Sequence, residues 1–338
     1  MDRIFPRVAS RAVIRLSLAL FAAASASAAG PVAADELSPA PASVSGRASA
    51  LVEKARALAA QSKIPSAETF LDMLRNPRPS PVELRPASAT PMRASDLARH
   101  ASSAHLRVGW VYRCTKCSNW HTNLAGGYAI APDTVVTAYH VLESPPENMQ
   151  PGTGFPVIVR GEDDIVPITA VVAADRGLDT VVLRVLSKDL AALPIAEKIA
   201  VGDAVFCLSD PFGQRGLFTA GIVNCLDAHA EGSGDKMASR RLIVSTDWAP
   251  GSSGSAVLDS FGNAAGHVDT VQTFASQKKP AREGKTIPDL PEAVLTLHFA
   301  VPAASVRTLL ESHPETTAPS DPKTGSGPPP QKSPALDE

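Results

Sequence analysis

The chain has 338 residues, of which 44% are hydrophobic and 20% are charged, which is enough for one sizeable globular unit with extensions. Its formal net charge is −2, so the composition does not indicate nucleic acid or an anionic membrane surface as a partner. These values exclude a strongly basic or strongly acidic protein, and the motifs must therefore indicate the function.

The first 28 residues have the pattern of a secretory signal peptide. Four arginines form a basic front: Arg3, Arg7, Arg11 and Arg15. An apolar stretch from Leu16 to Ala24 follows, and Ala26-Ser-Ala28 resembles a cleavage site. The apolar stretch is too short to span a bilayer stably, although an uncleaved anchor is the alternative. We therefore expect a secreted or periplasmic protein with no membrane span after cleavage.

Residues 29–104 are rich in Ala, Pro and Ser and contain too few large apolar residues for a core of their own. Two short helices are expected, at Arg47–Ser62 and at Ala67–Arg75, the second bounded by Ser66 and Asn76. They could pack on the following domain or form a removable pro-segment. A linker with transient helices is the alternative.

The strand patterns from residue 105 onward are short and punctuated by Gly, Pro and Asp, which predicts an all-β domain. The apolar run Gly127–Val136 is typical of two strands around a Pro-Asp turn, with His140 just after the second. Asp179 lies at the start of another buried strand. A carboxylate in that position can orient an imidazole and stabilise its charged form.

The segment Ala249–Ser255, with the sequence Ala-Pro-Gly-Ser-Ser-Gly-Ser, has the form of a serine nucleophile in a glycine turn. The Ser253 hydroxyl would attack a carbonyl, and the backbone N–H groups of Gly251 and Ser253 would form the oxyanion hole that receives the developing charge. The order His140, Asp179, Ser253 is the chain order of chymotrypsin-type proteases.

These motifs resemble those of trypsin-like serine proteases of the bacterial HtrA (DegP-like) branch, over about residues 105–312. The resemblance lies in Thr137–Val141, Asp179–Leu183, Val201–Gly213, Thr219–Val223, Gly251–Ser255, Leu297–Pro302 and the closing helix Ser305–Leu310. It implies two six-stranded antiparallel β-barrels, roughly 105–190 and 197–302, with the active site between them. It also implies a serine endopeptidase that needs no cofactor or metal and acts on extended peptides.

The chain departs from the family pattern at several positions. Tyr139 replaces a small residue before the histidine, and Ser255 replaces the second glycine after the serine. About 25 residues follow the closing helix, too few for a PDZ domain, so PDZ-regulated behaviour is not expected. Residues 313–338 are rich in Pro, Gly and Ser, which predicts a disordered tail.

Three residues are candidates for substrate binding. Asp247 precedes Ser253 by six residues, the separation at which trypsin places the aspartate that selects Arg or Lys. Asp247 also resembles a structural aspartate of HtrA proteins, which favour small aliphatic residues, and this is the interpretation we prefer. Gly266 and His267 follow the serine strand, in the segment that forms one wall of the specificity pocket in the family.

The chain has four cysteines, and an even number in a secreted protein favours disulfides. Cys207 and Cys225 fall on consecutive strands that flank a hairpin, and Cys114 and Cys117 flank a two-residue turn. We predict bridges 207–225 and 114–117. A zinc site formed by Cys114, Cys117 and His121 is the alternative, although no fourth ligand is evident.

Three functions therefore remain open. The first is a serine endopeptidase that cleaves extracytoplasmic protein or peptide substrates through His140, Asp179 and Ser253. The second is a non-proteolytic binding or chaperone module on a protease fold. The third is a redox or metal protein centred on Cys114 and Cys117, which is disfavoured because a thioredoxin-like motif needs a helix N-terminus.

Overall fold

The computed structural model describes residues 44–227, 240–275 and 293–312. The expected signal peptide at 1–28 and the expected tail at 313–338 lie outside these residues. In the described ranges no helix combines the length and apolar character needed to cross a membrane.

Within the described residues, three helices precede the first strand: α1 (Val44–Ala60), α2 (Ala67–Arg75) and α3 (Ala94–Ala104). The first two correspond to the expected helical segments. Ser66 caps α2 by accepting a hydrogen bond from the Thr69 N–H at 3.2 Å. Phe70 of α2 is fully buried and meets Trp110 edge-on, with ring centroids 6.0 Å apart. The extension is therefore packed on the strands that follow it.

Helix α3 was not expected, because its sequence contains a single large apolar residue, Leu97. Leu97, Ala101 and Ala104 are all buried, at the spacing of one helix face. Small alanines carry little hydrophobic signal in a sequence, yet they let a helix approach closely. Packing against the neighbouring strands therefore stabilises this helix more than its own composition does.

The first sheet is antiparallel throughout and is hydrogen-bonded in the order β5-β4-β1-β2-β3-β7-β6. Its strands are β1 (His105–Arg113), β2 (Trp120–Ala131), β3 (Thr134–Thr137), β4 (Phe155–Arg160), β5 (Asp164–Val166), β6 (Ile168–Asp175) and β7 (Thr180–Val185). The expectation of a closed six-stranded barrel over 105–190 is wrong here, since the sheet has seven strands and forms an open half-barrel. Pro167, which lacks an N–H donor, lies between β5 and β6. β5 pairs with β4 at one edge of the sheet, and β6 pairs with β7 at the other edge.

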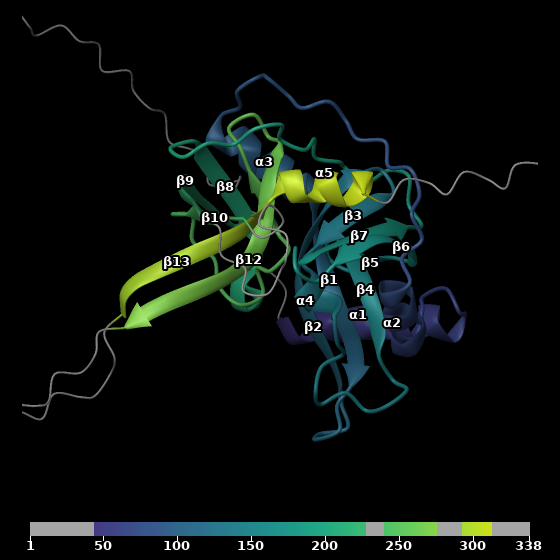
Figure 1. The fold of residues 1–338 in the computed structure, drawn as a ribbon. Coiled ribbons are helices and arrows are strands. Elements are labelled where there is room, and N and C mark those ends of the chain that lie inside the picture. Colours follow the sequence, from purple (N-terminus) through teal and green to yellow (C-terminus); the bar gives the residue numbers. More distant parts are fainter. Residues whose placement is uncertain (1–43, 228–239, 276–292, 313–338) are drawn as a thin grey trace, which may run out of the picture. The chain divides into compact units, whose positions relative to one another are not determined.

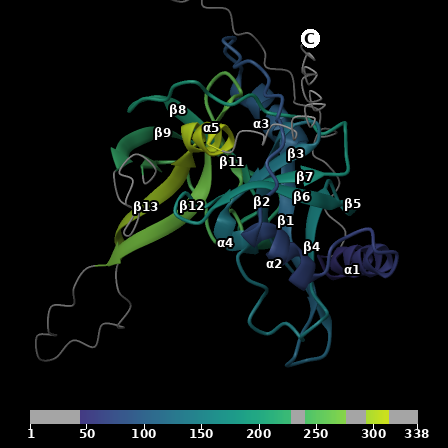
Figure 2. The same ribbon diagram turned by 45° about the vertical axis from the view of Figure 1, so that its right-hand side comes forward.

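The second sheet is the expected six-stranded closed barrel, with the order β10-β13-β12-β11-β8-β9. Its strands are β8 (Ala204–Ser209), β9 (Leu217–Asp227), β10 (Arg241–Val244), β11 (Ala256–Leu258), β12 (Ala264–Ala275) and β13 (Ala293–Pro302). Val205, Leu242 and Val257 point inward and are fully buried. Figures 1 and 2 show that the β12–β13 hairpin extends well beyond the rest of the barrel.

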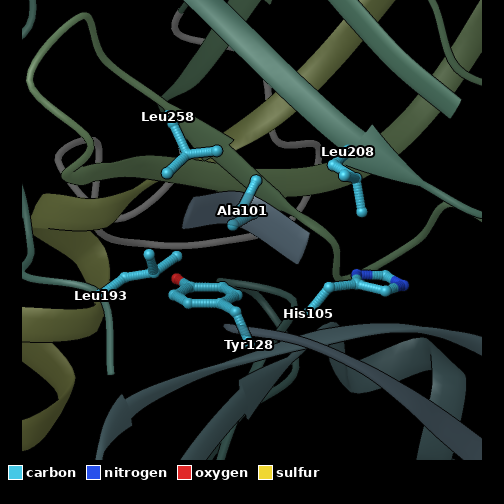
Figure 3. Close-up of a pocket in the computed structure, with 7 residues that line it drawn as sticks. Ala101, His105, Tyr128, Leu193, Leu208 and Leu258 are labelled. Atoms are coloured by element: carbon cyan, nitrogen blue, oxygen red, sulfur yellow. The ribbon is translucent and has the colours of Figure 1, made fainter. Parts of the chain in front are cut away.

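The two sheets share one buried apolar cluster, which includes Tyr128 of β2, Leu258 of β11 and Val306 of helix α5 (Ala303–Glu311). A cavity of about 10 Å³ remains in this contact, close to the minimum for one water molecule. Figure 3 shows the Tyr128 ring among the aliphatic side chains that line it. Because the shared cluster is otherwise filled, it determines how the sheets face each other.

All four cysteines are free thiols, so the predicted disulfides are not formed. Cys207 of β8 lies opposite Thr219, whereas Cys225 lies opposite Ile243 of β10. Cys225 is six residues beyond Thr219 along β9, which is about 20 Å at 3.3 Å per residue. The 207–225 bridge was wrong because adjacency of two strands does not determine their register.

Candidate active site

His140 lies in the short helix α4 (Tyr139–Leu142), directly after β3 ends at Thr137. The preceding residues Val136 and Ala138 are fully buried and anchor this turn, while the His140 side chain is 45% exposed. The backbone N–H of His140 donates to Asp179 Oδ1 at 2.9 Å. Both the position and the orientation of His140 are therefore set by the neighbouring Asp179.

Asp179 directly precedes β7 and has a left-handed backbone conformation with φ 49°. Aspartate tolerates this conformation better than most residues do. Its buried carboxylate lies 2.9 Å (Oδ2) and 3.1 Å (Oδ1) from His140 Nδ1. An ionised carboxylate only accepts hydrogen bonds, so Nδ1 is the protonated nitrogen. The neutral imidazole then keeps Nε2 as an acceptor, which is the arrangement that a general base requires.

Ser253 lies in a tight turn between β10 and β11. Gly254 has φ +79°, and a Cβ at that position would come within 2.4 Å of Thr137 Oγ1. The Ser253 carbonyl accepts a hydrogen bond from the Gly126 N–H of β2 at 2.8 Å, and Gly254 donates to the Val268 carbonyl at 2.8 Å. The serine turn is thus attached both to the first sheet and to its own barrel.

The turn also orients two backbone donors. Within the described residues, neither the Gly251 N–H nor the Ser253 N–H donates a hydrogen bond. The Pro250 carbonyl accepts from the Phe212 N–H at 2.8 Å. Because a trans peptide directs its C=O and N–H to opposite sides, the Gly251 N–H points away from Phe212. These two donors are available to an external oxygen.

His140 and Ser253 line two cavities of about 360 Å³ each, and both cavities also include Pro250. The first cavity extends over β2 residues 123–125 and over the loop 144–147. The second is bounded by Trp248, Ala249 and residues 268–271. In the described part of the chain Ser253 Oγ makes no hydrogen bond to His140, as is common for catalytic pairs without substrate. Both side chains therefore stand where the two cavities meet.

The charges around His140 favour its protonated form. Burial acts against that charge, but the hydrogen bond and the negative charge of Asp179 outweigh it, with smaller contributions from Asp269 and Glu143, so the pKa of His140 is raised above its ordinary value. Burial likewise opposes ionisation of Asp179, and the bond to His140 nevertheless lowers the pKa of that carboxyl. Both pKa shifts favour an ion pair between a protonated His140 and an ionised Asp179.

The three candidate substrate-binding residues do not line either cavity. The Asp247 side chain is 83% exposed and lies 4.0 Å from His298. His267 is fully buried, and its Nε2 donates to the Asp179 carbonyl at 3.1 Å. Gly266 is buried in β12, where a Cβ would contact the Val301 carbonyl at 2.3 Å. His267 therefore holds the backbone of Asp179 in place through this hydrogen bond.

Sequence reasoning missed Asp269 and Arg241. Asp269 lines the second cavity, and one of its oxygens lies within 4.8 Å of the nearest His140 and Asp179 ligand atoms. It forms an ion pair with Arg241, whose side chain is 8% exposed and also donates to the Gly177 carbonyl at 3.3 Å. The two residues are 28 positions apart on different strands, and neither stands in a recognisable motif.

Comparison with known proteins is consistent with this geometry. Residues 125–266, which include His140, Asp179 and Ser253, match the family model of a trypsin-like peptidase domain. No match was found among curated proteins. This part of the chain is therefore similar to a trypsin-like peptidase domain, and the matched segment contains all three residues of the candidate triad.

Two solved structures illustrate the similarity. The HtrA-type protease AlgW with a tripeptide is 18% identical with a TM-score of 0.45, and the match covers 66% of this chain and 64% of that chain. The serine endoprotease from Yersinia pestis is 19% identical with a TM-score of 0.44, over 66% of this chain and 67% of that chain. This chain thus matches slightly less than two thirds of the length of the AlgW chain.

Proposed function

We propose that the protein is an HtrA-like serine endopeptidase that cleaves peptide bonds through His140, Asp179 and Ser253 with an acyl-enzyme intermediate. The observation that carries this proposal is the Asp179 carboxylate, which accepts hydrogen bonds from both the backbone and Nδ1 of His140. It leaves Nε2 on the wall of the two cavities that Ser253 also lines. This is the arrangement that activates a serine hydroxyl.

In this mechanism His140 Nε2 takes the proton of the Ser253 hydroxyl as Oγ attacks the substrate carbonyl. The resulting oxyanion accepts hydrogen bonds from the N–H groups of Gly251 and Ser253, which have no other acceptor within the described residues. His140 then returns the proton to the leaving amine. A water molecule, activated by the same nitrogen, releases the acid product from Ser253.

The second cavity supports a preference for small aliphatic side chains before the cut. Trp248, Val268 and Val271 contribute apolar surface to it. Its carboxylate, Asp269, already pairs with Arg241. The exposed Asp247 lies outside the lining, which removes the main argument for Arg or Lys. Val-ending chromogenic peptides should be cleaved faster than Arg-ending ones; faster cleavage after Arg that Asp247→Ser abolishes would contradict this preference.

A secreted or periplasmic location is part of the proposal and rests on the basic, apolar and small-residue order of residues 1–28. N-terminal sequencing of the protein recovered from its native host tests it. A mature chain that begins after Ala28 supports export, and a chain recovered in the cytoplasm with Met1 retained contradicts it.

Covalent labelling tests the proposed activity directly. A fluorophosphonate probe should modify the wild-type protein at Ser253 and should not modify Ser253→Ala. Labelling of His140→Ala should be strongly reduced, because the hydroxyl then lacks its base. Ser252→Ala is the matched control, since the neighbouring Ser252 hydroxyl is buried and donates to Ser209 Oγ at 3.0 Å. A folded wild-type protein that is not labelled would favour the binding or chaperone alternative.

A further inference from the structure

A second cluster of reactive side chains lies outside the candidate active site, at the turn between β1 and β2. Cys114, Cys117 and His121 each direct one ligand atom toward the others, and these three atoms lie within 4.8 Å of one another. Cys117 Sγ and His121 Nε2 are 3.0 Å apart. No sulfur in the cluster is engaged in a disulfide. The cluster therefore consists of two thiols and one imidazole whose ligating atoms face one another.

The backbone of the turn holds these residues in place. The Cys114 N–H donates to the Asn119 carbonyl at 2.8 Å, and the Ser118 N–H donates to the Cys114 carbonyl at 3.0 Å. The Arg113 side chain donates from Nε to the Ser118 carbonyl at 3.0 Å. Because these bonds close the hairpin, the two sulfurs and the ring on β2 are brought together before any ligand arrives.

Two N–H groups point at the buried sulfur of Cys114. The backbone N–H of Lys116 and the side-chain amide of Asn148 each donate to it at 3.3 Å. Cys114 is 3% exposed, so these donors replace water around the sulfur. Donors of this kind stabilise a thiolate, which is the form of cysteine that binds metal, and they orient it in the way that outer groups orient metal ligands.

We propose that Cys114, Cys117 and His121 bind one zinc ion, with a water molecule in the fourth position. With Zn–S near 2.3 Å and Zn–N near 2.0–2.1 Å, the corners of a tetrahedral site lie roughly 3.4–3.8 Å apart. One pair of the observed atoms is 3.0 Å apart and all three lie within 4.8 Å of one another, so small side-chain rotations would bring them to these spacings. Two thiolates and an imidazole are ligands that suit zinc, and each thiol loses its proton on binding.

This site is connected to the cleft through the loop that follows α4. The Thr115 N–H donates to the Asn148 carbonyl at 2.8 Å, and the Gln150 N–H donates to the Arg113 carbonyl at 2.7 Å. Cys114 itself forms an isolated antiparallel bridge with Met149. Residues 144–147 of the same loop line the first cavity with His140 and Ser253. A zinc ion bound at the turn would therefore hold one wall of the cleft in position.

Metal titration of the reduced full-length protein tests the site. Zinc, measured in competition with a chromophoric chelator, should bind at one equivalent, and cobalt in its place should show thiolate charge-transfer absorption and the visible bands of a tetrahedral site. Cys117→Ser and His121→Ala should each weaken zinc binding at least about 10-fold, because each variant removes one of the three protein ligands. Cys225→Ser, which removes an exposed thiol elsewhere, is the control and should bind as wild type does.

Two results would overturn the proposal. The first is absence of stoichiometric binding by the reduced protein. The second is binding that Cys117→Ser and His121→Ala leave unchanged. A Cys114–Cys117 disulfide that forms readily in air and a reduced protein that ignores zinc would identify a redox pair instead.

A kinetic measurement tests the connection to the cleft, and it rests on the proposed peptidase activity. Removal of zinc, or His121→Ala, should raise KM for a peptide long enough to occupy the first cavity and should leave kcat nearly unchanged, since the proposed triad contains no metal. Equal KM values with and without zinc would overturn the connection. The titration needs no activity, so failure of the proposed function and failure of the metal site are distinguishable.

Discussion

The two regions that build the candidate active site are organised by different kinds of contact. In the first sheet, His140 and Asp179 are 39 residues apart in sequence and are joined by side-chain hydrogen bonds. In the barrel, Ser253 is positioned by backbone contacts, of which the bond from the Gly126 N–H is the one that crosses to the first sheet. The comparison shows that side-chain chemistry sets the orientation of the base, whereas close backbone approach sets the position of the nucleophile.

The two regions also differ in the amino-acid substitutions that they tolerate. Gly126 and Gly254 meet at the contact between the two regions, and a Cβ on Gly126 would lie 1.9 Å from Ser255 Oγ. Asp179 instead uses its carboxylate, and its left-handed backbone is one that Asn also adopts. Substitutions in the two regions should therefore fail for different reasons, electrostatic in one and steric in the other.

Removal of the reacting groups should have the largest effect. Ser253→Ala and His140→Ala should each lower kcat by roughly 10⁴–10⁶-fold, by analogy with measured triads, when turnover of a chromogenic peptide is followed. Both side chains are partly exposed, so the melting temperature should stay close to that of the wild type. Turnover of Ser253→Ala at the wild-type rate would show that the assignment of the nucleophile is incorrect.

The orienting role of the first sheet should appear next. Asp179→Asn should lower kcat by about 10⁴-fold, because an amide can stabilise the wrong imidazole tautomer and cannot balance the imidazolium charge. Far-ultraviolet circular dichroism should be unchanged. The control is Asp164→Asn, an exposed residue paired with Arg160, which should keep full activity. A fully active Asp179→Asn would mean that side-chain orientation is not what the first sheet supplies.

Backbone contact between the two regions should matter by a smaller factor. Gly126→Ala should lower kcat by about 10²-fold, because the added Cβ pushes the serine turn away from His140. The control is Gly202→Ala, which has φ +94° and no atom within 4 Å of the added Cβ. That control should cost about 1–2 kcal/mol of folding stability from backbone strain and leave kcat unchanged. Equal kcat values for the two variants would contradict the steric role of Gly126.

The pH dependence should show the smallest and most local effect. His140 acts as a base when it is neutral, so activity should rise with pH, with a midpoint above 6.5, its ordinary value, since the pKa of His140 is raised. The negative charge of Asp269 favours the imidazolium, so Asp269→Asn should lower the pKa of His140 and move the midpoint to lower pH. A pH–rate profile of kcat/KM measures both. An upward shift in the variant would contradict the stated sign.

The parts of the site that could be predicted from the sequence are those written in short stretches of chain. Each of His140, Asp179 and Ser253 stands in a motif of about five residues beside a strand, and Ala67–Arg75 carries its own cap and apolar face. Asp269 could not be found in this way, because its nearness to His140 depends on β12 meeting β7 through His267 and Asp179. The spacing of Asp247 from Ser253 likewise did not indicate that the Asp247 side chain is exposed.

The sequence by itself determined the classes of strand and helix, the mostly β character and the three residues of the candidate triad, because these depend on local propensity and spacing. Tertiary structure decided the seven-stranded sheet and the register that separates Cys207 from Cys225. Sheet topology and strand register depend on hydrogen bonds between residues far apart in the chain. Such bonds are chosen by the packing of whole sheets against one another, and no short stretch of sequence records that choice.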